Sequence, residues 1–254
     1  MGPLSKSLTA ALRWKITKSS PRVVRNALTA AGFTLVNGRD KWLAYWGKHL
    51  TSDKFEKFSP FQTINHFPYS FEIGRKDKLW LNYCNMRNIH GSSAVNHIPE
   101  TFLLPRNRSN LDRAFHTSNA WIIKPPASAR GIGIKVITKP TSLPSTKKRK
   151  EVICSKYISN PFLINKRKFD LRLYVLVTSF EPLRVYLYDY GLARFASESY
   201  TKMSGGKKST YRYSHLTNYS INKKNKHEVL NSGIFAESER FAMKDNKWYI
   251  LNCF

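Results

Sequence analysis

The chain has 254 residues, 41% of them hydrophobic, and its 43 Lys and Arg against 16 Asp and Glu give a formal net charge of +27 at pH 7. This length and apolar content predict a globular protein, built as one large domain or as two to three small lobes. The charge excess predicts an acidic partner: nucleic acid, an anionic membrane surface or an acidic protein segment.

Cysteine usage and hydropathy bound the cellular compartment. The three cysteines lie far apart, without a Cys-x-x-Cys pair, so the sequence offers no zinc site and favours a reducing compartment. Residues 1–16 lack the apolar core of about seven residues that a signal peptide needs, and no apolar run approaches the roughly 20 residues that span a bilayer. We therefore expect a soluble, intracellular protein without a membrane partner.

The first predicted elements are a helix and a strand. Residues 21–32 combine a first-turn proline, helical spacing of apolar residues and a glycine stop. Residues 33–36 then predict a strand that enters an Asn37-Gly38 turn. Trp42 and Trp46 follow, and such a pair belongs more often to a core than to a binding site.

A basic stretch precedes the next helix. Arg75, Lys76 and Lys78 stand at the start of a helix predicted from Leu79 onward, which is the end of a helix where cations are unfavourable. Either an anionic ligand or a solvated first turn would account for them. Further along, residues 101–104 predict a strand, and Ser109 is expected to cap a helix through about Phe115.

Residues 121–136 predict a buried strand, a loop of small residues and a second strand. Lys124 ends the first strand, where a lysine is costly unless an anion meets it. Gly131 and Gly133 would let backbone N–H groups approach phosphate oxygens, although the residue order is not that of a Walker loop. We interpret the segment as a nucleotide-phosphate clamp; an ordinary hairpin whose lysine reaches solvent fits this segment alone equally well.

Two further strands are predicted. Residues 152–158 form a buried strand whose end offers backbone hydrogen bonds to a flat ligand such as adenine. Over residues 168–177, Lys168, Asp170 and Arg172 alternate with apolar residues at period two, so one face is charged. That face is either solvated or the wall of a cleft.

The segments that follow favour the cleft. We expect residues 183–188 and 192–196 to form a hairpin that brings Arg194 beside the charged face, in an antiparallel sheet with converging cations. Residues 215–220 offer five hydrogen-bonding side chains in six positions. Such density indicates a site, with a polar turn as the alternative.

Several motifs in this order resemble the tubulin tyrosine ligase-like family, specifically its polyglutamylases, from about Arg13 to Trp248. The motifs that carry the resemblance are NHFP at 65–68, GRKD at 74–77, WIIKPPASARGIG at 121–133, KFDLRLYV at 168–175 and HLTNYS at 215–220. The resemblance implies an α/β (α+β) fold of the ATP-grasp type. Its lobes would be an N-terminal lobe over residues 1–75, a central lobe with the nucleotide-covering loop over 76–158, and an incomplete C-terminal lobe over 159–254.

The implied reaction is the ATP-dependent ligation of L-glutamate onto glutamate side chains of acidic tubulin tails, with Mg²⁺ as a cofactor. The implied partners are tubulin tails, free L-glutamate and other acidic proteins. The implied locations are the cytoplasm and the microtubule cytoskeleton, with the cilium or basal body as further sites, and we expect a monomer. The charge permits nucleic-acid binding, but no helix-turn-helix, finger or RNA-recognition pattern supports it.

The resemblance also implies site residues. Those implied to bind nucleotide are Lys76, Lys124, Arg130, Gly131, Ser155, Lys156, Tyr157, Ile158, Lys168, Phe169, Asp170, Thr217 and Asn218. Those implied to bind L-glutamate are Arg194, Tyr219, Ser220 and Lys247. Arg172 would act near the transferred phosphate, and Arg130 would favour starting a branch over lengthening one.

The sequence departs from the family at two places. Ser155 stands where similar sequences carry glutamine, so the adenine contact is expected to be weakened or passed to the backbone. The family's Mg²⁺ ligands, a later acidic residue and a Glu-x-Asn pair, are absent from this sequence. We therefore expect the chain as it stands to bind acidic peptides without transferring glutamate. The alternative function is a non-catalytic basic module that binds microtubules or other acidic proteins.

Overall fold

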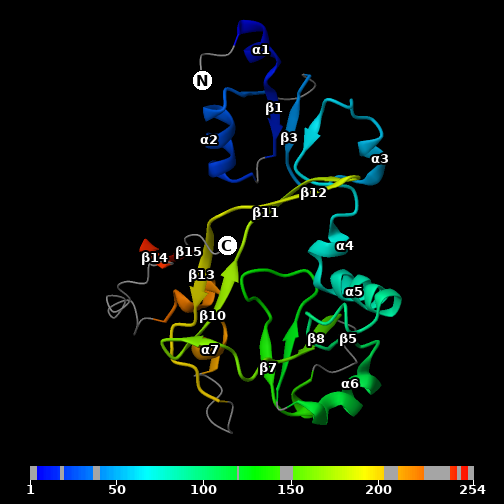
Figure 1. Cartoon of the computed structure of the whole chain (residues 1–254), viewed down its shortest axis with the longest axis vertical. Helices are drawn as coiled ribbons and strands as arrows, with labels where there is room; N and C mark the ends of the chain where they lie inside the picture. Colours follow the sequence, from blue (N-terminus) through cyan, green and yellow to red (C-terminus); the bar gives the residue numbers. More distant parts are fainter. Residues whose placement is uncertain are drawn as a thin grey trace. The chain divides into compact units, whose positions relative to one another are not determined.

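A computed structural model describes residues 5–17, 20–36, 41–118, 120–143, 151–202 and 211–225, together with the backbone of residues 241–244 and 247–250. The chain is of mixed α/β class and divides into two compact units, Met1–Asn82 and Tyr83–Phe254 (Figure 1). The boundary between the units lies inside helix α5 (Lys76–His90). The sequence predicted this helix.

The first unit is built on a four-stranded parallel sheet in the order β2-β1-β3-β4. Its strands are β1 (Arg13–Ile16), β2 (Thr34–Leu35), β3 (Ala44–Trp46) and β4 (Thr63–Ile64). Its helices are α1 (Lys6–Ala11), α2 (Arg22–Ala30), α3 (Ser52–Phe55) and α4 (Phe71–Gly74).

The early sequence predictions are mostly confirmed. Helix α2 begins after Pro21 and is followed by Gly32 at a φ of +84°, the left-handed geometry that glycine adopts without strain. The expected core role is wrong for Trp46, which is 39% exposed, whereas Trp14 on the central strand β1 is fully buried. The Asn37-Gly38 turn lies outside the described residues.

The second unit begins with a four-stranded antiparallel sheet in the order β5-β8-β6-β7. The strands are β5 (Thr101–Leu104), β6 (Trp121–Lys124), β7 (Lys135–Ile137) and β8 (Val152–Lys156), and all four were predicted. Helix α6 (Arg108–Ala114) starts at Asn107 rather than at the predicted cap Ser109. Asn107 Oδ1 accepts a hydrogen bond from the Leu103 N–H at 3.1 Å, which ties the helix start to β5. Two 3-10 turns, η1 (Phe115–Thr117) and η2 (Pro140–Ser142), complete this part.

The main core of the second unit lies between this sheet and α6. Its buried members are Leu104, Leu111, Phe115, Trp121, Ile123, Ile137 and Cys154. Trp121 and Leu111 are fully buried. This core fixes β6, so its last residue, Lys124, has a defined position.

A second antiparallel sheet has five strands in the order β14-β15-β13-β10-β9. They are β9 (Leu163–Ile164), β10 (Arg167–Arg172), β13 (Gly191–Phe195), β14 (Phe241–Lys244) and β15 (Lys247–Ile250). Two short helices, α7 (Tyr211–His215) and α8 (Tyr219–Asn222), carry the polar motif predicted at 215–220. Within the described ranges, no helix combines the length and apolar character needed to cross a membrane.

Two strand predictions are wrong. The strand expected over residues 168–177 ends at Arg172, and β11 (Val175–Phe180) leaves the sheet to pair with β12 (Leu183–Leu187). The expected hairpin between residues 183–188 and 192–196 does not form, because β12 pairs with β11 and β13 pairs with β10. Alternation at period two reports which face a side chain takes, but it does not report the partner strand.

We predict that Leu111→Ala lowers the free energy of unfolding by about 2–5 kcal/mol, because it opens a cavity in the core between α6 and the first sheet of the second unit. The matched control is Leu183→Ala on β12, where the side chain is 65% exposed. The control should change the value by less than about 0.5 kcal/mol. Denaturant unfolding measures both, and equal losses would contradict this placement of the core.

Candidate functional site

A half-buried lysine lies where the four-stranded and the five-stranded sheet of the second unit meet. Lys168, on β10, donates a hydrogen bond from Nζ to the Tyr157 hydroxyl at 2.9 Å, and Nζ lies 4.3 Å from the centre of the Tyr157 ring. Tyr157 follows β8 directly and is buried. Its hydroxyl lies 2.7 Å from Nδ1 of the buried His215 at the end of α7.

The environment of Lys168 disfavours its positive charge. The pKa of Lys168 is lowered from 10.5 to about 8, mainly by burial and in addition by the charge of nearby Lys124, while Asp170 acts in the opposite direction. Within the described part of the chain, no carboxylate lies within ion-pair distance of Lys168. A desolvated ammonium group close to a second ammonium group and without a carboxylate is the arrangement expected where an anion binds.

The remaining charges of the predicted face pair with each other. Asp170 and Arg194 are opposite one another on β10 and β13, and the guanidinium donates to both carboxylate oxygens, from Nε at 2.9 Å and from Nη2. These hydrogen bonds raise the pKa of Arg194, with burial opposing. The prediction that Arg194 would lie beside the charged face is therefore confirmed, although the predicted hairpin does not place it there.

The loop predicted as a phosphate clamp joins β6 to β7, which pair as an antiparallel hairpin. Arg130, Gly131 and Gly133 have φ angles of +60°, +75° and +73°. Positive φ is easily adopted only by glycine, so Arg130 holds a strained backbone conformation. A Cβ on Gly131 would lie 2.5 Å from Ile221 Cδ1 and 3.1 Å from Asn218 Oδ1. The loop therefore approaches helix α8 as closely as glycine allows.

The loop is also hydrogen-bonded to α8. Ser220 Oγ donates to the carbonyl oxygen of Arg130 at 2.8 Å, across 90 positions of sequence. The two motifs that the sequence singled out at 121–133 and 215–220 are thus brought together in space. Ser220 was predicted to contact L-glutamate. Its hydroxyl proton is donated to the loop, and its oxygen is still able to accept a hydrogen bond from a ligand.

The segment predicted as the adenine edge is already well bonded. The Ser155 hydroxyl is buried and accepts from Thr101 Oγ1 at 2.9 Å. The N–H groups of Lys156 and Tyr157 donate to the carbonyl oxygens of Glu100 and Ala120, at 2.8 and 3.0 Å. An adenine ring would have to bind to other groups of this segment, among which the side chains of Lys156 and Ile158 are exposed.

Other predicted residues are dispersed. Phe169 stacks on Phe195 at 5.6 Å, on the face of β10 opposite to Lys168 because neighbours in a strand alternate. Arg172, at the end of β10, is exposed. Thr217 is half-buried just before α8, and Tyr219 is 53% exposed with Lys223 Nζ 5.9 Å from its ring centre. The side chain of Lys247 lies outside the described residues.

The basic stretch of the first unit pairs with acidic side chains. Arg75 donates to Asp77 at 2.7 Å and Lys78 lies 3.4 Å from Glu72. The hydrogen bonds from Arg75 are the main cause that lowers the pKa of Asp77. Ion pairs within the chain account for Arg75 and Lys78. From the sequence, only an anionic ligand or a solvated first turn was expected. Lys76 belongs to this unit, so its predicted contact with a phosphate stays a prediction.

Sequence reasoning missed several members of the site. His215 opens the HLTNYS motif but was not predicted as a site residue, and Tyr157 was predicted only as part of a backbone edge. Tyr200, whose ring centre lies 4.7 Å from that of His215, carried no sequence signal. The density of polar residues at 215–220 was the signal that could have identified His215.

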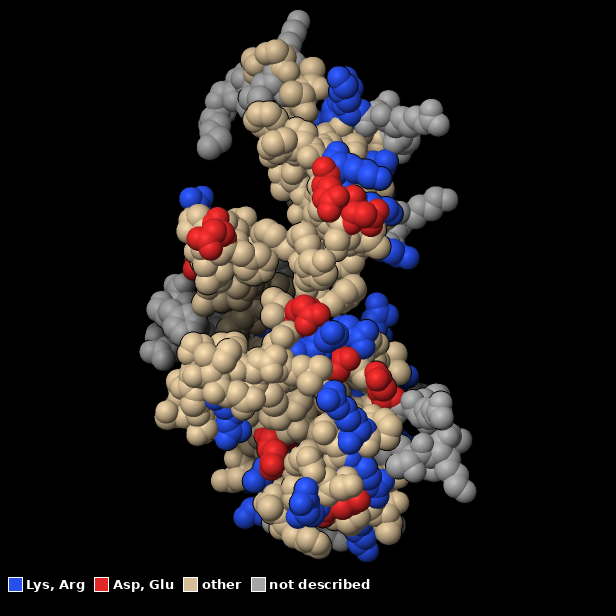
Figure 2. All heavy atoms as spheres, turned by 90° about the vertical axis from the view of Figure 1, so that its right-hand side faces the viewer, with Lys and Arg blue, Asp and Glu red and all other residues tan. Residues whose placement is uncertain are grey.

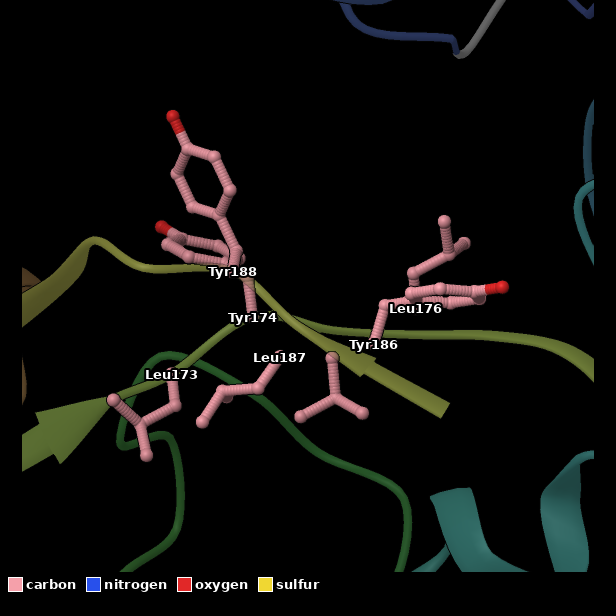
Figure 3. A pocket seen from close by; sticks show the side chains of 7 residues that line it. Leu173, Tyr174, Leu176, Tyr186, Leu187 and Tyr188 are labelled. Atoms are coloured by element: carbon pink, nitrogen blue, oxygen red, sulfur yellow. The ribbon is translucent and has the colours of Figure 1, made fainter. Parts of the chain in front are cut away.

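A pocket of about 460 Å³ lies elsewhere, on the β11–β12 pair. In Figure 3, Tyr174, Leu176, Tyr186 and Tyr188 point to one side of the two strands and Leu173 and Leu187 to the other. This lining is tyrosine and aliphatic and includes none of the predicted site residues. It is therefore not a phosphate site.

A divalent cation does not fit the residues that are described. Among them, no three His, Cys, Asp or Glu side chains gather closely enough to hold a metal ion. Asp170, the carboxylate nearest in sequence to Lys168, is engaged by Arg194 on both oxygens.

Comparison with known proteins matches the sequence to a family. Residues 54–251 match the sequence profile of the tubulin-tyrosine ligase family, which is more than half of the chain. The chain therefore belongs to the tubulin-tyrosine ligase family, whose mixed α/β architecture agrees with the observed sheets.

Three similar proteins illustrate the relationship. The tubulin monoglutamylase TTLL4 of Homo sapiens is 42% identical over 242 residues, which cover 93% of this chain and 19% of that protein. The tubulin polyglutamylase ttll-4 of Caenorhabditis briggsae is 44% identical over 225 residues, covering 86% and 36%. The tubulin polyglutamylase TTLL5 of Homo sapiens is 40% identical over 242 residues, covering 93% and 18%. The chain thus spans 18% to 36% of the length of these relatives.

We predict that Gly131→Ala and Ser220→Ala each speed tryptic cleavage after Arg130, because each removes one of the contacts that hold the loop on α8. Gly131→Ala should also lower the free energy of unfolding by about 1 kcal/mol or more. Gly74→Ala is the matched control, since a Cβ there meets nothing within 4 Å. Peptide mapping against time measures the cleavage, and unchanged rates in both variants would show that the loop is held in another way.

Proposed function

We propose that this chain carries the nucleotide-binding part of an ATP-dependent ligase that adds L-glutamate to glutamate side chains of acidic tubulin tails. The observation that supports it most is Lys168: a half-buried lysine, close to Lys124 and without a carboxylate partner among the described residues. The family membership and the names of the three similar proteins support the substrate. The ATP-grasp arrangement with lobes at 1–75, 76–158 and 159–254 is part of the proposal.

The chemistry needs positive charge where negative charge gathers. In the proposed reaction, a carboxylate oxygen of the acceptor glutamate takes the γ-phosphoryl group of ATP and ADP leaves. The amine of free L-glutamate then attacks the acyl carbon, loses a proton and displaces phosphate, which leaves an isopeptide bond. Lys124 and Lys168 would hold the phosphates, and the Arg130–Gly131 segment would cover them.

The bound L-glutamate would lie near Arg194, Tyr219 and Ser220, with Lys247 as a further contact. Asp170 takes up the Nε and Nη2 donors of Arg194. A guanidinium group has five N–H donors, so the remaining ones are sufficient for a second carboxylate. Arg172 would act on the transferred phosphate, and Arg130 would favour starting a branch over lengthening one.

Magnesium belongs to the proposed chemistry as the family's cofactor, where it would neutralise phosphate charge. The described residues do not fit this ion. No ligand for it is therefore assigned among the described residues.

The alternative is a non-catalytic basic module that binds acidic proteins by charge. On the face shown in Figure 2, Lys and Arg side chains are dispersed and Asp and Glu side chains lie among them. A surface that binds by charge alone usually gathers one sign in a stripe or patch. The specific environment of Lys168 supports the ligase over the charge-binding module.

The direct experiment is to incubate the purified protein with ATP, Mg²⁺, radiolabelled glutamate and tubulin, beside tubulin from which the acidic tails have been removed. Because its sequence lacks the family's Glu-x-Asn pair, the chain as it stands is expected to bind intact tubulin without transferring label. The same chain extended with a family segment that carries this pair is expected to label intact tubulin only, and only with ATP. Salt-sensitive binding to tails without nucleotide binding would instead favour the basic module. Binding that survives tail removal and is competed by DNA would overturn the tubulin substrate.

We predict that affinity for a non-hydrolysable ATP analogue falls by about tenfold between pH 7 and pH 9, because Lys168 loses its proton with a pKa of about 8. An anion binds the charged form of the lysine, so the affinity is highest below this pKa and falls as the pH rises above it. Lys168→Met should bind weakly at every pH. Calorimetry against pH measures this, with the exposed Lys139→Ala as control.

The same pKa shift predicts that stability without ligand changes with pH in the opposite direction to the affinity for the ATP analogue. Burial costs stability while Lys168 is charged, since its pKa is lower in the folded than in the unfolded chain. Between about pH 8 and pH 10.5 the unfolded chain binds more protons, so this residue's contribution to the free energy of unfolding rises with pH. A wild-type curve that matches the Lys168→Met curve throughout would contradict the assigned environment.

A further inference from the structure

We propose that His215 is a positioning residue, which acts through the Tyr157 hydroxyl to orient the Lys168 ammonium group toward its anionic ligand. The proposal rests on the proposed function for the identity of that ligand, a nucleotide phosphate. It extends the site to a buried side chain that would not touch the ligand itself.

The direction of the hydrogen bonds follows from the groups involved. A lysine ammonium group only donates, so the Tyr157 oxygen accepts from Lys168 at 2.9 Å. The Tyr157 proton is then available for Nδ1 of His215 at 2.7 Å, and the proposal takes Nδ1 as its acceptor. This order corresponds to a neutral imidazole with its proton on Nε2.

The surroundings of His215 favour that neutral form. The side chain is 1% exposed, and the rings of Tyr157, Tyr200 and Tyr211 have their centres 5.7, 4.7 and 5.3 Å from its own. Burial is the main cause that lowers the pKa of His215; Lys168 adds to it and the backbone of Thr201 opposes it. Three rings from separate segments hold the imidazole, so Nδ1 has a fixed position.

The consequence for Lys168 is a fixed orientation. Its ammonium group faces three charged or titratable neighbours: the Tyr157 hydroxyl from the end of β8, Lys124 from β6 and Asp170 from β10. Tyr157 is the acceptor that the described structure gives it, so two of its three N–H groups are left for phosphate oxygens. A lysine held in place loses less side-chain entropy when the ligand binds.

Three variants test the chain of hydrogen bonds. Tyr157→Phe removes the hydroxyl, His215→Leu removes the acceptor, and His215→Asn keeps an acceptor oxygen close to the position of Nδ1. We expect the first two to lose affinity for the ATP analogue by about three- to tenfold, the worth of one hydrogen bond. The asparagine variant should stay within about twofold of the wild type, since its acceptor is retained. Melting temperatures recorded alongside identify any variant that fails to fold.

A second measurement does not depend on nucleotide binding. NMR of ε-labelled lysine follows the titration of Lys168 in the ligand-free protein. Tyr157→Phe should move its midpoint to lower pH, because the charged form loses its acceptor. His215→Leu should move it in the same direction, because the Tyr157 hydroxyl is no longer held in position to accept, and His215→Asn should leave it near the wild-type value.

The outcomes separate the two proposals. If the wild-type protein does not bind the analogue while the variants shift the Lys168 titration as expected, the proposed function is overturned and the role of His215 is kept. A folded Tyr157→Phe that leaves both the affinity and the titration of Lys168 unchanged would overturn the role of His215. His215 would be a packing residue only if His215→Asn and His215→Leu lost the same affinity for the analogue, in proportion to their fall in melting temperature, and left the Lys168 titration unchanged.

Discussion

The structure of the second unit depends on one costly constraint, the burial of the Lys168 ammonium group. Lowering its pKa from 10.5 to about 8 corresponds to about 3 kcal/mol of unfavourable free energy while the group is charged at neutral pH. A chain carries such a cost where the charge is used. The hydrogen bond to Tyr157, and through it to His215, holds the group in place between the four-stranded and the five-stranded sheet of the second unit. An anion beside Lys124 and Lys168 would recover much of the cost.

The glycine loop and the polar motif around α8 form the second element of the site. The strained backbone at Arg130 and the absence of a side chain at Gly131 let the loop lie against Ile221, and Ser220 holds it there. A loop that must cover and release a ligand needs contacts that are weak individually and specific in position. One hydroxyl and one close approach meet that need. The loop and α8 therefore act on each other directly, although the sequence separates them widely.

Charge acts at two levels in this protein. The formal net charge of +27 favours acidic partners over long range and without specificity. Close to the site the charges are individually placed: Asp170 pairs with Arg194, and Arg75 pairs with Asp77. Lys168 differs from these cations because its hydrogen-bond partner is a phenol. This difference, rather than the total charge, distinguishes a binding site from a basic surface.

The sequence by itself determined the local elements and the segments that matter. Turn residues, strand alternation and small-residue loops act between neighbours in the chain, so β5, β6, β7, β8, α5 and the clamp loop follow from them. The tertiary structure decided the partners: β11 pairs with β12 instead of continuing β10, and His215 meets Tyr157 across 58 positions. Pairing and burial depend on which surfaces come together when the chain collapses. A period-two pattern or an isolated histidine carries no information about the residue it will face.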